Sequence, residues 1–302
     1  MSETVKQNSV RAWLLASRPK TLTAAAVPVM IGSAVAWRET SGTGVEYMAM
    51  IFCFLFAFVM QIEANFVNDY YDCVCGRDNE QRLGPQRACQ QGWVTLRAMY
   101  IAIGITAALA GVVGMPLVLY GGWHLVWVGV ACMIFCFLYT TLLAGKGLGD
   151  LLVLLFFGLV PCYFTYYVVM PETLQSFDNA TVWALSLASG LVVDTLLLVN
   201  NYRDIDNDRS VGKCTLVVLL GRESTELLYL LIVPMSIILV LLGIKNNIWQ
   251  LLYVVAILVP HLHTWYTMRK IGEGKALNRV LGMTARNIFI FGILTTILII
   301  LS

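Results

Sequence analysis

The chain contains nine uninterrupted apolar runs, each about as long as a helix that crosses a lipid bilayer. A hydrocarbon core of about 30 Å needs about 20 apolar residues in helical conformation. The runs are continuously apolar rather than alternating, which excludes the strands of a membrane barrel. The sequence therefore predicts an all-α integral membrane protein with nine transmembrane helices around a central cavity. The expected spans are residues 21–37, 46–66, 97–119, 122–142, 149–170, 181–201, 225–244, 247–268 and 284–301.

Composition supports the same class of protein. Of the 302 residues, 59% are apolar and 13% are charged, whereas soluble domains average about 45–50% apolar and about 25% charged. These values exclude a soluble globule, a disordered chain and a small disulfide-stabilised scaffold. The net charge of +2 gives no reason to expect a nucleic-acid partner, and the eight cysteines contain no C-x-x-C pair that would indicate structural zinc. We expect a single polytopic domain over residues 1–302 in the lipid bilayer, with no obligate protein partner.

Lys and Arg are concentrated on one side of the predicted spans. If the N-terminus and the loops after spans 2, 4, 6 and 8 face one side, these segments hold 18 of the 20 basic residues. The other side holds only Arg38 and Lys245. Because basic residues mark the cytoplasmic side of a membrane protein, we expect residues 1–20 to be cytoplasmic or interfacial. The expected location is the cell (inner or plasma) membrane.

Acidic residues gather in two clusters, each where a span ends on the predicted cytoplasmic side. The first extends from span 2 into a loop expected over residues 67–96, and the second extends from span 6 into a loop expected over residues 202–224. Each cluster contains the pattern Asn-x-x-x-Asp, at Asn68 and Asp72 and at Asn200 and Asp204. Four spans separate them, which is typical of a tandem, parallel four-helix repeat. The repeat predicts that both clusters face one cavity on the cytoplasmic side.

A pocket of carboxylates and carboxamides needs a cation, because like charges at short range repel strongly. Oxygen ligands favour a hard divalent cation, and Mg²⁺ usually binds through one or two carboxylates together with phosphate oxygens of a substrate. Basic residues alternate with the acids in both clusters, as expected where a diphosphate is bound. The alternative is that both loops are solvated charged surfaces. The matched spacing and topology favour the metal site.

Motifs along nearly the whole chain resemble those of the UbiA superfamily of intramembrane aromatic prenyltransferases, and within it the branch that prenylates 1,4-dihydroxy-2-naphthoate. In the first acidic motif, Gly76 stands where the 4-hydroxybenzoate branch usually has a third acid, and Asp78 follows two positions later. This departure favours the naphthoate branch. In chain order, the motifs are Ser17-Arg18-Pro19-Lys20-Thr21-Leu22, Asn68-Asp69-x-x-Asp72-x-x-x-Gly76-x-Asp78, Leu83-Gly84-Pro85-x-Arg87, Gly147-Leu148-Gly149-Asp150, Asn200-Asn201-x-Arg203-Asp204-x-x-x-Asp208, Gly212-Lys213-x-Thr215-Leu216 and Ala276-Leu277-Asn278-x-x-Leu281-x-x-Thr284-Ala285.

The resemblance implies a reaction and a set of site residues. A polyprenyl chain would pass from polyprenyl diphosphate to the naphthoate ring with loss of CO₂ and diphosphate, giving demethylmenaquinone, with Mg²⁺ as cofactor. The catalytic, metal-binding acids would be Asp72, Asp78, Asp204 and Asp208, with Asn68 and Asn201 completing the metal shell. The diphosphate would be bound by Arg77, Arg87, Lys146, Arg203, Arg209 and Lys213. The acceptor or the allylic cation would lie near Arg18, Lys20, Asn65, Tyr139, Asp150, Phe157 and Asp194, with Phe156 and Tyr163 as further aromatic candidates.

The roles of two intramembrane acids stay open, and so do two other functions. Asp194 is about 15 Å deeper than Asp204 at 1.5 Å per residue, and is either functional or a paired structural carboxyl; Glu63 has no assigned role. A related enzyme could act on 4-hydroxybenzoate or another acceptor. A cation-coupled transporter would also carry carboxylates and a repeat, but transporter sites are usually near the midplane of the membrane.

Overall fold

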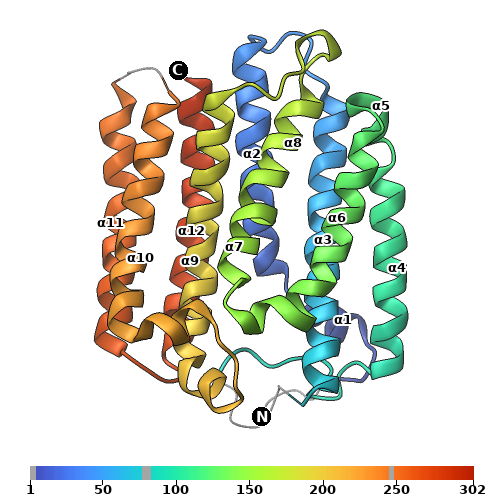
Figure 1. The fold of residues 1–302 in the computed structure, drawn as a ribbon, viewed down its shortest axis with the longest axis vertical. Coiled ribbons are helices and arrows are strands. Elements are labelled where there is room, and N and C mark those ends of the chain that lie inside the picture. Colours follow the sequence, from blue (N-terminus) through green and yellow to red (C-terminus); the bar gives the residue numbers. More distant parts are fainter. Residues whose placement is uncertain (1–4, 77–82, 245–247) are drawn as a thin grey trace.

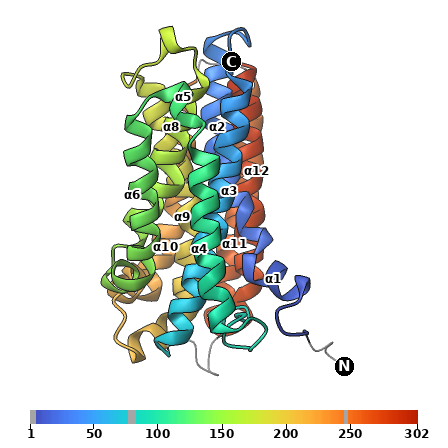
Figure 2. The same cartoon turned by 90° about the vertical axis from the view of Figure 1, so that its right-hand side faces the viewer.

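The computed structural model describes residues 5–76, 83–244 and 248–302, and this part of the chain is helical without strands. Nine helical segments within it are long and apolar enough to cross a membrane, as the sequence predicts. They stand roughly parallel in one bundle (Figures 1 and 2). The helices are α1 (Val10–Ser17), α2 (Leu22–Glu39), α3 (Tyr47–Val74), α4 (Leu96–Gly114), α5 (Leu117–Gly121), α6 (His124–Leu138), α7 (Gly149–Leu154), α8 (Val160–Val169), α9 (Ala180–Ser210), α10 (Leu216–Leu242), α11 (Trp249–Ile271) and α12 (Leu277–Ile300).

The core of the bundle is built around α2, which packs against α12, α8 and α3. Its segment from Ala24 to Ala36 is largely buried and rich in Ala and Val. Small side chains let helix backbones approach closely inside a membrane. Small residues also let α9 approach the π-helical turn Leu155–Leu159 closely: a Cβ on Gly158 would lie 2.6 Å from the Cα of Gly190. This close crossing sets α9 directly against the wall of the cavity described below.

Helices α3 and α9 are longer than the membrane requires, and this corrects the predicted loops. With 28 and 31 residues, they extend about 42 and 46 Å at 1.5 Å per residue, compared with a hydrocarbon core of about 30 Å. The loops expected over residues 67–96 and 202–224 were therefore wrong at their starts, because helix continues to Val74 and to Ser210. The acidic motifs lie on the last turns of these two helices.

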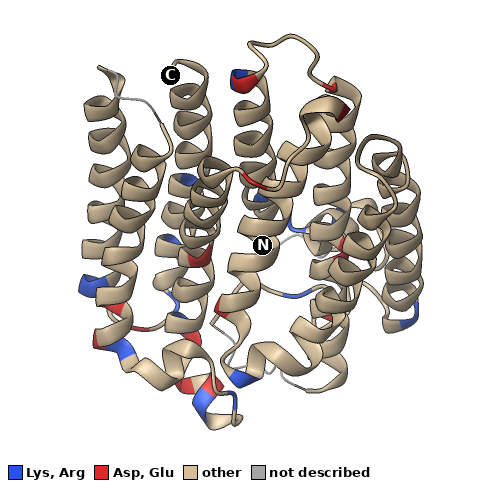
Figure 3. Ribbon diagram, turned by 45° about the horizontal axis from the view of Figure 1, so that its top comes forward, with Lys and Arg blue, Asp and Glu red and all other residues tan. Residues whose placement is uncertain are grey.

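Both long helices end at the same end of the bundle, called here the motif end (Figure 1). In Figure 3, most of the charged positions lie toward this end of the ribbon. The C-terminal end of α12 lies at the opposite end (Figure 1). Most charged residues of the bundle therefore lie toward one of its two ends.

Candidate functional site

A large, mainly apolar cavity of about 980 Å³ runs through the side of the bundle that contains α3, α4 and α6. Tyr139 and Leu125 both line it and are 14 residues apart on one helical segment, so it extends about 20 Å along the axis of that segment. Helices α10 and α11 contribute no lining residue among those that the structure describes. The cavity can therefore hold a long hydrocarbon chain.

A small polar chamber of about 100 Å³ adjoins the large cavity at the motif end. This volume is enough for several waters or a hydrated cation. The two spaces share part of their walls, namely Asn68, Arg87, Tyr139, Leu197 and Asn200. The chamber is also lined by polar groups that come from both acidic motifs, including Asp72, Asn201, Asp208 and Lys213. Residues from distant parts of the chain thus meet at the boundary between polar and apolar space.

In the first motif, the loop that precedes α4 folds back over the end of α3. Arg87 of this loop forms an ion pair with Asp72 at 2.8 Å, and both side chains are about 8% exposed. Asp69 is turned away from the chamber and accepts hydrogen bonds from the backbone N–H groups of Ala88 at 3.0 Å and Cys89 at 3.4 Å. Asp69 therefore holds the loop, while Asn68 and Asp72 face the chamber.

In the second motif, Arg203 is buried within the bundle and bonded to its own neighbours. It donates to both carboxylate oxygens of Asp204, at 2.9 and 2.6 Å, and to the side chain of Asn200 at 2.8 Å. Its side chain is 0% exposed. The prediction that Arg203 binds a diphosphate was wrong: its guanidinium neutralises Asp204 inside the protein. Asp204 itself does not line the chamber.

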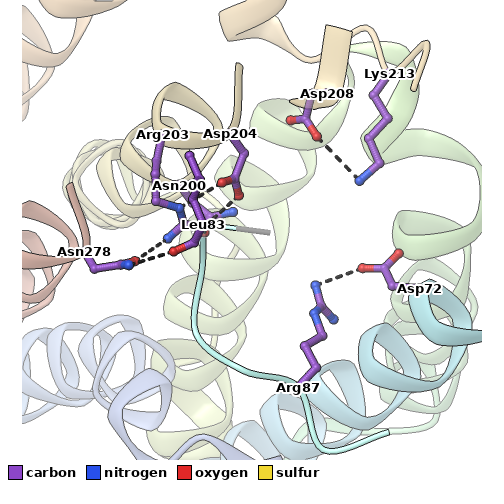
Figure 4. A network of polar contacts seen from close by, with 9 residues as sticks. All are labelled: Asp72, Leu83, Arg87, Asn200, Arg203, Asp204, Asp208, Lys213 and Asn278. Carbon is purple, nitrogen blue, oxygen red and sulfur yellow. Dashed lines mark hydrogen bonds and ion pairs between the residues drawn. The ribbon is translucent and has the colours of Figure 1, made fainter. Parts of the chain in front are cut away.

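The last acid of the second motif does face the chamber. Asp208 is buried, and Lys213 lies 3.7 Å from its carboxylate. Figure 4 shows Arg87 and Lys213 pointing into the space between Asp72 and Asp208. Two carboxylates and two cations from opposite sides of the chamber therefore surround one space.

The remaining predicted cations fall into two groups. Lys146 and Arg209 are exposed and line neither space, so the structure does not bring them to the site. Arg18 and Lys20 line the large cavity together with Asn65; Asn65 donates to the carbonyl of Ser17 at 2.9 Å. Arg77 and Asp78 lie outside the described residues.

The predicted aromatic wall is partly present. Tyr139, Phe156 and Phe157 line the large cavity, and all three lie in π-helical turns, Tyr139–Leu143 and Leu155–Leu159. Such turns are frequent at functional sites because they redirect side chains. Tyr163 was predicted for this wall but lies elsewhere: its ring packs on Trp183, with ring centroids 4.4 Å apart, and on Phe177.

Two further predicted site residues, the acids Asp150 and Asp194, lie on α7 and α9. Both are buried, and neither lines the chamber or the large cavity. Their Oδ1 atoms have no hydrogen-bond partner in the described part of the chain. Glu63 is also buried and accepts a hydrogen bond from Thr106. Tyr139 lines the cavity, whereas Asp150, Asp194 and Glu63 do not.

The donor set of the chamber fits Mg²⁺ bound together with a phosphate group. Among the described residues, no group of three or more His, Cys, Asp or Glu could hold an ion without other ligands. Two carboxylates, Asp72 and Asp208, and the carboxamides of Asn68, Asn200 and Asn201 line the chamber. Mg²⁺ typically combines one or two carboxylates with substrate phosphate oxygens and water. Asn200, which the sequence did not single out as a ligand, also lines the chamber, but its side-chain oxygen already accepts a hydrogen bond from Arg203.

The model of the UbiA prenyltransferase family matches residues 25–288. The chain belongs to this family. A member from Escherichia coli (strain K12), named 1,4-dihydroxy-2-naphthoate octaprenyltransferase, is 31% identical over 312 residues, covering 97% of this chain and 96% of that protein. Membership in the UbiA family makes the chain a prenyltransferase and overturns the transporter alternative.

Solved structures of UbiA homologs share the fold. The apo structure of a homolog from Aeropyrum pernix K1 has a TM-score of 0.68 at 15% identity, covering 91% of this chain and 97% of that one. A homolog from Archaeoglobus fulgidus, bound to GPP and Mg²⁺, has a TM-score of 0.60 at 14% identity, covering 94% and 99%. At these identities, the likeness shows the fold alone.

Proposed function

We propose that this UbiA family member transfers a polyprenyl group from polyprenyl diphosphate to 1,4-dihydroxy-2-naphthoate. The C–O bond to the diphosphate breaks, a C–C bond forms at the ring carbon that carries the carboxylate, and CO₂ and diphosphate leave. The product is the reduced form of demethylmenaquinone. The observation that carries the proposal is a chamber lined by both acidic motifs that adjoins a large apolar cavity.

The polar chamber would bind the diphosphate. Asp72 and Asp208, with Asn68 and Asn201, would hold Mg²⁺, and Arg87 and Lys213 would contact phosphate oxygens. The chemistry that Mg²⁺ supplies when bound is neutralisation of the charge on the departing diphosphate. Cations that are fixed in place before the reaction stabilise such charge more than mobile ones do. Asp204, the first acid of the second motif, would act through Arg203 and Asn200 rather than at the metal.

The large cavity would hold the prenyl chain and shield the allylic cation. Burial of a prenyl chain gains about 0.8 kcal/mol per CH₂, which explains why such an enzyme resides in a membrane. The faces of Tyr139, Phe156 and Phe157 attract a cation and line the cavity.

The naphthoate would enter at the motif end, guided by Arg18 and Lys20, which line the large cavity. Asp150 and Asp194 stay predicted members of the acceptor pocket, although neither lines the large cavity. The distribution of basic residues supports a cytoplasmic position for this end and for the N-terminus, in an inner or plasma membrane. The paired motifs support a tandem four-helix repeat.

The sequence similarity to the Escherichia coli protein, 31% identity over nearly the whole chain, supports the naphthoate acceptor. The alternative acceptor is 4-hydroxybenzoate. The test uses the purified chain in lipid vesicles with Mg²⁺, octaprenyl diphosphate and carboxyl-labelled 1,4-dihydroxy-2-naphthoate. We expect release of labelled CO₂ together with a prenylated naphthoquinol, and no product with 4-hydroxybenzoate. Prenylated hydroxybenzoate without any naphthoate product would overturn the choice of acceptor.

A further inference from the structure

Asn278 at the start of α12 connects two parts of the site that are far apart in the sequence. Its side-chain oxygen accepts a hydrogen bond from Arg203 at 2.8 Å, and its side-chain nitrogen donates to the backbone carbonyl of Leu83 at 2.8 Å. Figure 4 shows both contacts running from Asn278 to Arg203 and Leu83. An arginine only donates and a carbonyl only accepts, so one carboxamide satisfies both.

The segment that begins at Leu83 carries Arg87 to the chamber. Arg87 forms the ion pair with Asp72, and the N–H groups of Ala88 and Cys89 are held by Asp69. The segment is thus fastened on both sides of Arg87: by Asp69 after it and by Asn278 before it. Pro85, with its fixed φ, limits the freedom of the chain between the two attachments.

The attachment at Asn278 depends on a rigid partner. Arg203 also binds Asp204 and Asn200 of the second motif, and its side chain is 0% exposed. A buried charge stays in place only with its hydrogen-bonding partners. The position of Arg87 beside the first motif therefore depends on contacts with the second motif. These contacts run through Leu83 and Asn278.

We infer that Asn278 is a positioning residue that holds the 83–89 segment so that Arg87 binds the diphosphate. The inference rests on the proposed function in that it needs a diphosphate in the chamber, but not on the identity of the acceptor. The Ala276-Leu277-Asn278 motif thereby obtains a physical role: α12 anchors the diphosphate-binding loop to α9.

The decisive variant is Asn278→Asp, which has the same shape and keeps the oxygen that accepts from Arg203. It lacks the N–H group that donates to Leu83. The probe is geranylgeranyl thiolodiphosphate with Mg²⁺, whose dissociation constant is measured by calorimetry on the full-length chain in detergent. Loss of one hydrogen bond that fixes the loop predicts binding about 5–10-fold weaker. The melting temperature should stay within about 2 °C of the wild-type value, because the bond to Arg203 remains.

Asn287→Asp is the matched control. Asn287 lies on the same helix and donates from its side-chain nitrogen to Thr264 at 2.9 Å and to the carbonyl of Pro260 at 3.2 Å, away from the chamber. It loses the same donors, so it reports the general cost of this substitution on α12. We expect no change in diphosphate binding for Asn287→Asp.

A double-mutant cycle with Arg87→Ala separates positioning from a direct contact. If Asn278 acts through Arg87, Asn278→Asp weakens binding in the wild-type background but by less than about twofold when Arg87 is already Ala. Equal effects in both backgrounds would overturn the inference, because Asn278 would then contact the ligand itself. Unchanged binding in Asn278→Asp would also overturn the inference. So would melting temperatures of both Asn278→Asp and Asn278→Gln that fall well below the Asn287→Asp value, because the role of Asn278 would then be general stability.

These outcomes are distinct from those for the proposed function. If the wild-type chain binds the thiolodiphosphate but yields no prenylated naphthoquinol, the choice of acceptor fails and the inference on Asn278 stands. If turnover is present and Asn278→Asp binds the probe as well as wild type does, the inference fails and the proposed function stands.

Discussion

The two acidic motifs share the pattern Asn-x-x-x-Asp, but the protein supports them in different ways. The motif on α3 is organised by a loop that returns to it: Asp69 holds Ala88 and Cys89, and Asp72 pairs with Arg87. The motif on α9 is organised largely from within its own helix, because Arg203 pairs with the adjacent Asp204. Similar sequence patterns therefore carry unequal roles, and equal substitutions should have unequal effects.

The largest effect on turnover is expected at Asp72. Asp72→Asn removes a carboxylate from the chamber and leaves the shape unchanged, so turnover should fall about 10²–10³-fold, the size of losses seen when a stabiliser of developing charge is removed. Initial rates of prenylated naphthoquinol formation measure this loss. Asp206→Asn is a matched control on α9, since Asp206 is exposed and pairs with Arg222 outside the chamber. Asp72→Asn with more than a tenth of wild-type turnover would contradict a role at the metal.

Substitution of Asp204 should differ from substitution of Asp72 by a larger loss in the free energy of unfolding. Asp204→Ala leaves the buried Arg203 without its anion, and loss of one partner of a buried ion pair costs about 3–5 kcal/mol. Asn200 and Asn278 still accept hydrogen bonds from Arg203, so we expect about 3 kcal/mol, measured as the free energy of unfolding in mixed micelles. Turnover should fall as well, because the second motif loses its support.

For Asp72→Asn, the corresponding loss of stability should be smaller, because Arg87 borders the chamber and can be hydrated there. A free energy of unfolding that is lowered equally in both variants would remove the distinction between the two motifs.

The smallest effect is expected at the cations of the second motif. Lys213 lines the chamber and Arg209 does not. Lys213→Ala should raise the KM for octaprenyl diphosphate about tenfold through loss of one charged contact, whereas Arg209→Ala should change it less than twofold. Steady-state kinetics at fixed naphthoate measures both values. A larger effect for Arg209→Ala would place the diphosphate on the outer side of α9.

The sequence predicts the membrane fold well, because the hydrophobic length of a span reports directly on bilayer thickness. Nine membrane-length apolar helices in the described part of the chain and the family match confirm these two predictions. Hydropathy reports where hydrocarbon ends but not where a helix ends, so the helical continuations to Val74 and Ser210 were not found. The π-helical turns that bring Tyr139 and Phe157 to the cavity wall leave no comparable signal in a single sequence.

The sequence predicts the residue types of the candidate site but not always which of them face the chamber. Asn68, Asp72, Asn201 and Asp208, the described residues among the predicted metal ligands other than Asp204, line the chamber; metal binding by them stays a prediction. Arg203 could not be separated from Arg87 by sequence, because alternating charges do not tell which cation faces a cavity and which one neutralises an acid inside the bundle. The roles of Asp69 and Asn278 depend on contacts with Ala88, Cys89 and Leu83, which follow from the return of a loop rather than from spacing.

The central claim is that Asp72 and Asp208, from two distant motifs, bind the same metal–diphosphate complex. Electron paramagnetic resonance with Mn²⁺ in place of Mg²⁺ and a prenyl thiolodiphosphate tests it directly. The account predicts bound Mn²⁺ coupled to ³¹P in the wild-type chain, and loss of this signal in both Asp72→Asn and Asp208→Asn. A ³¹P-coupled signal of wild-type strength in either variant would contradict the claim.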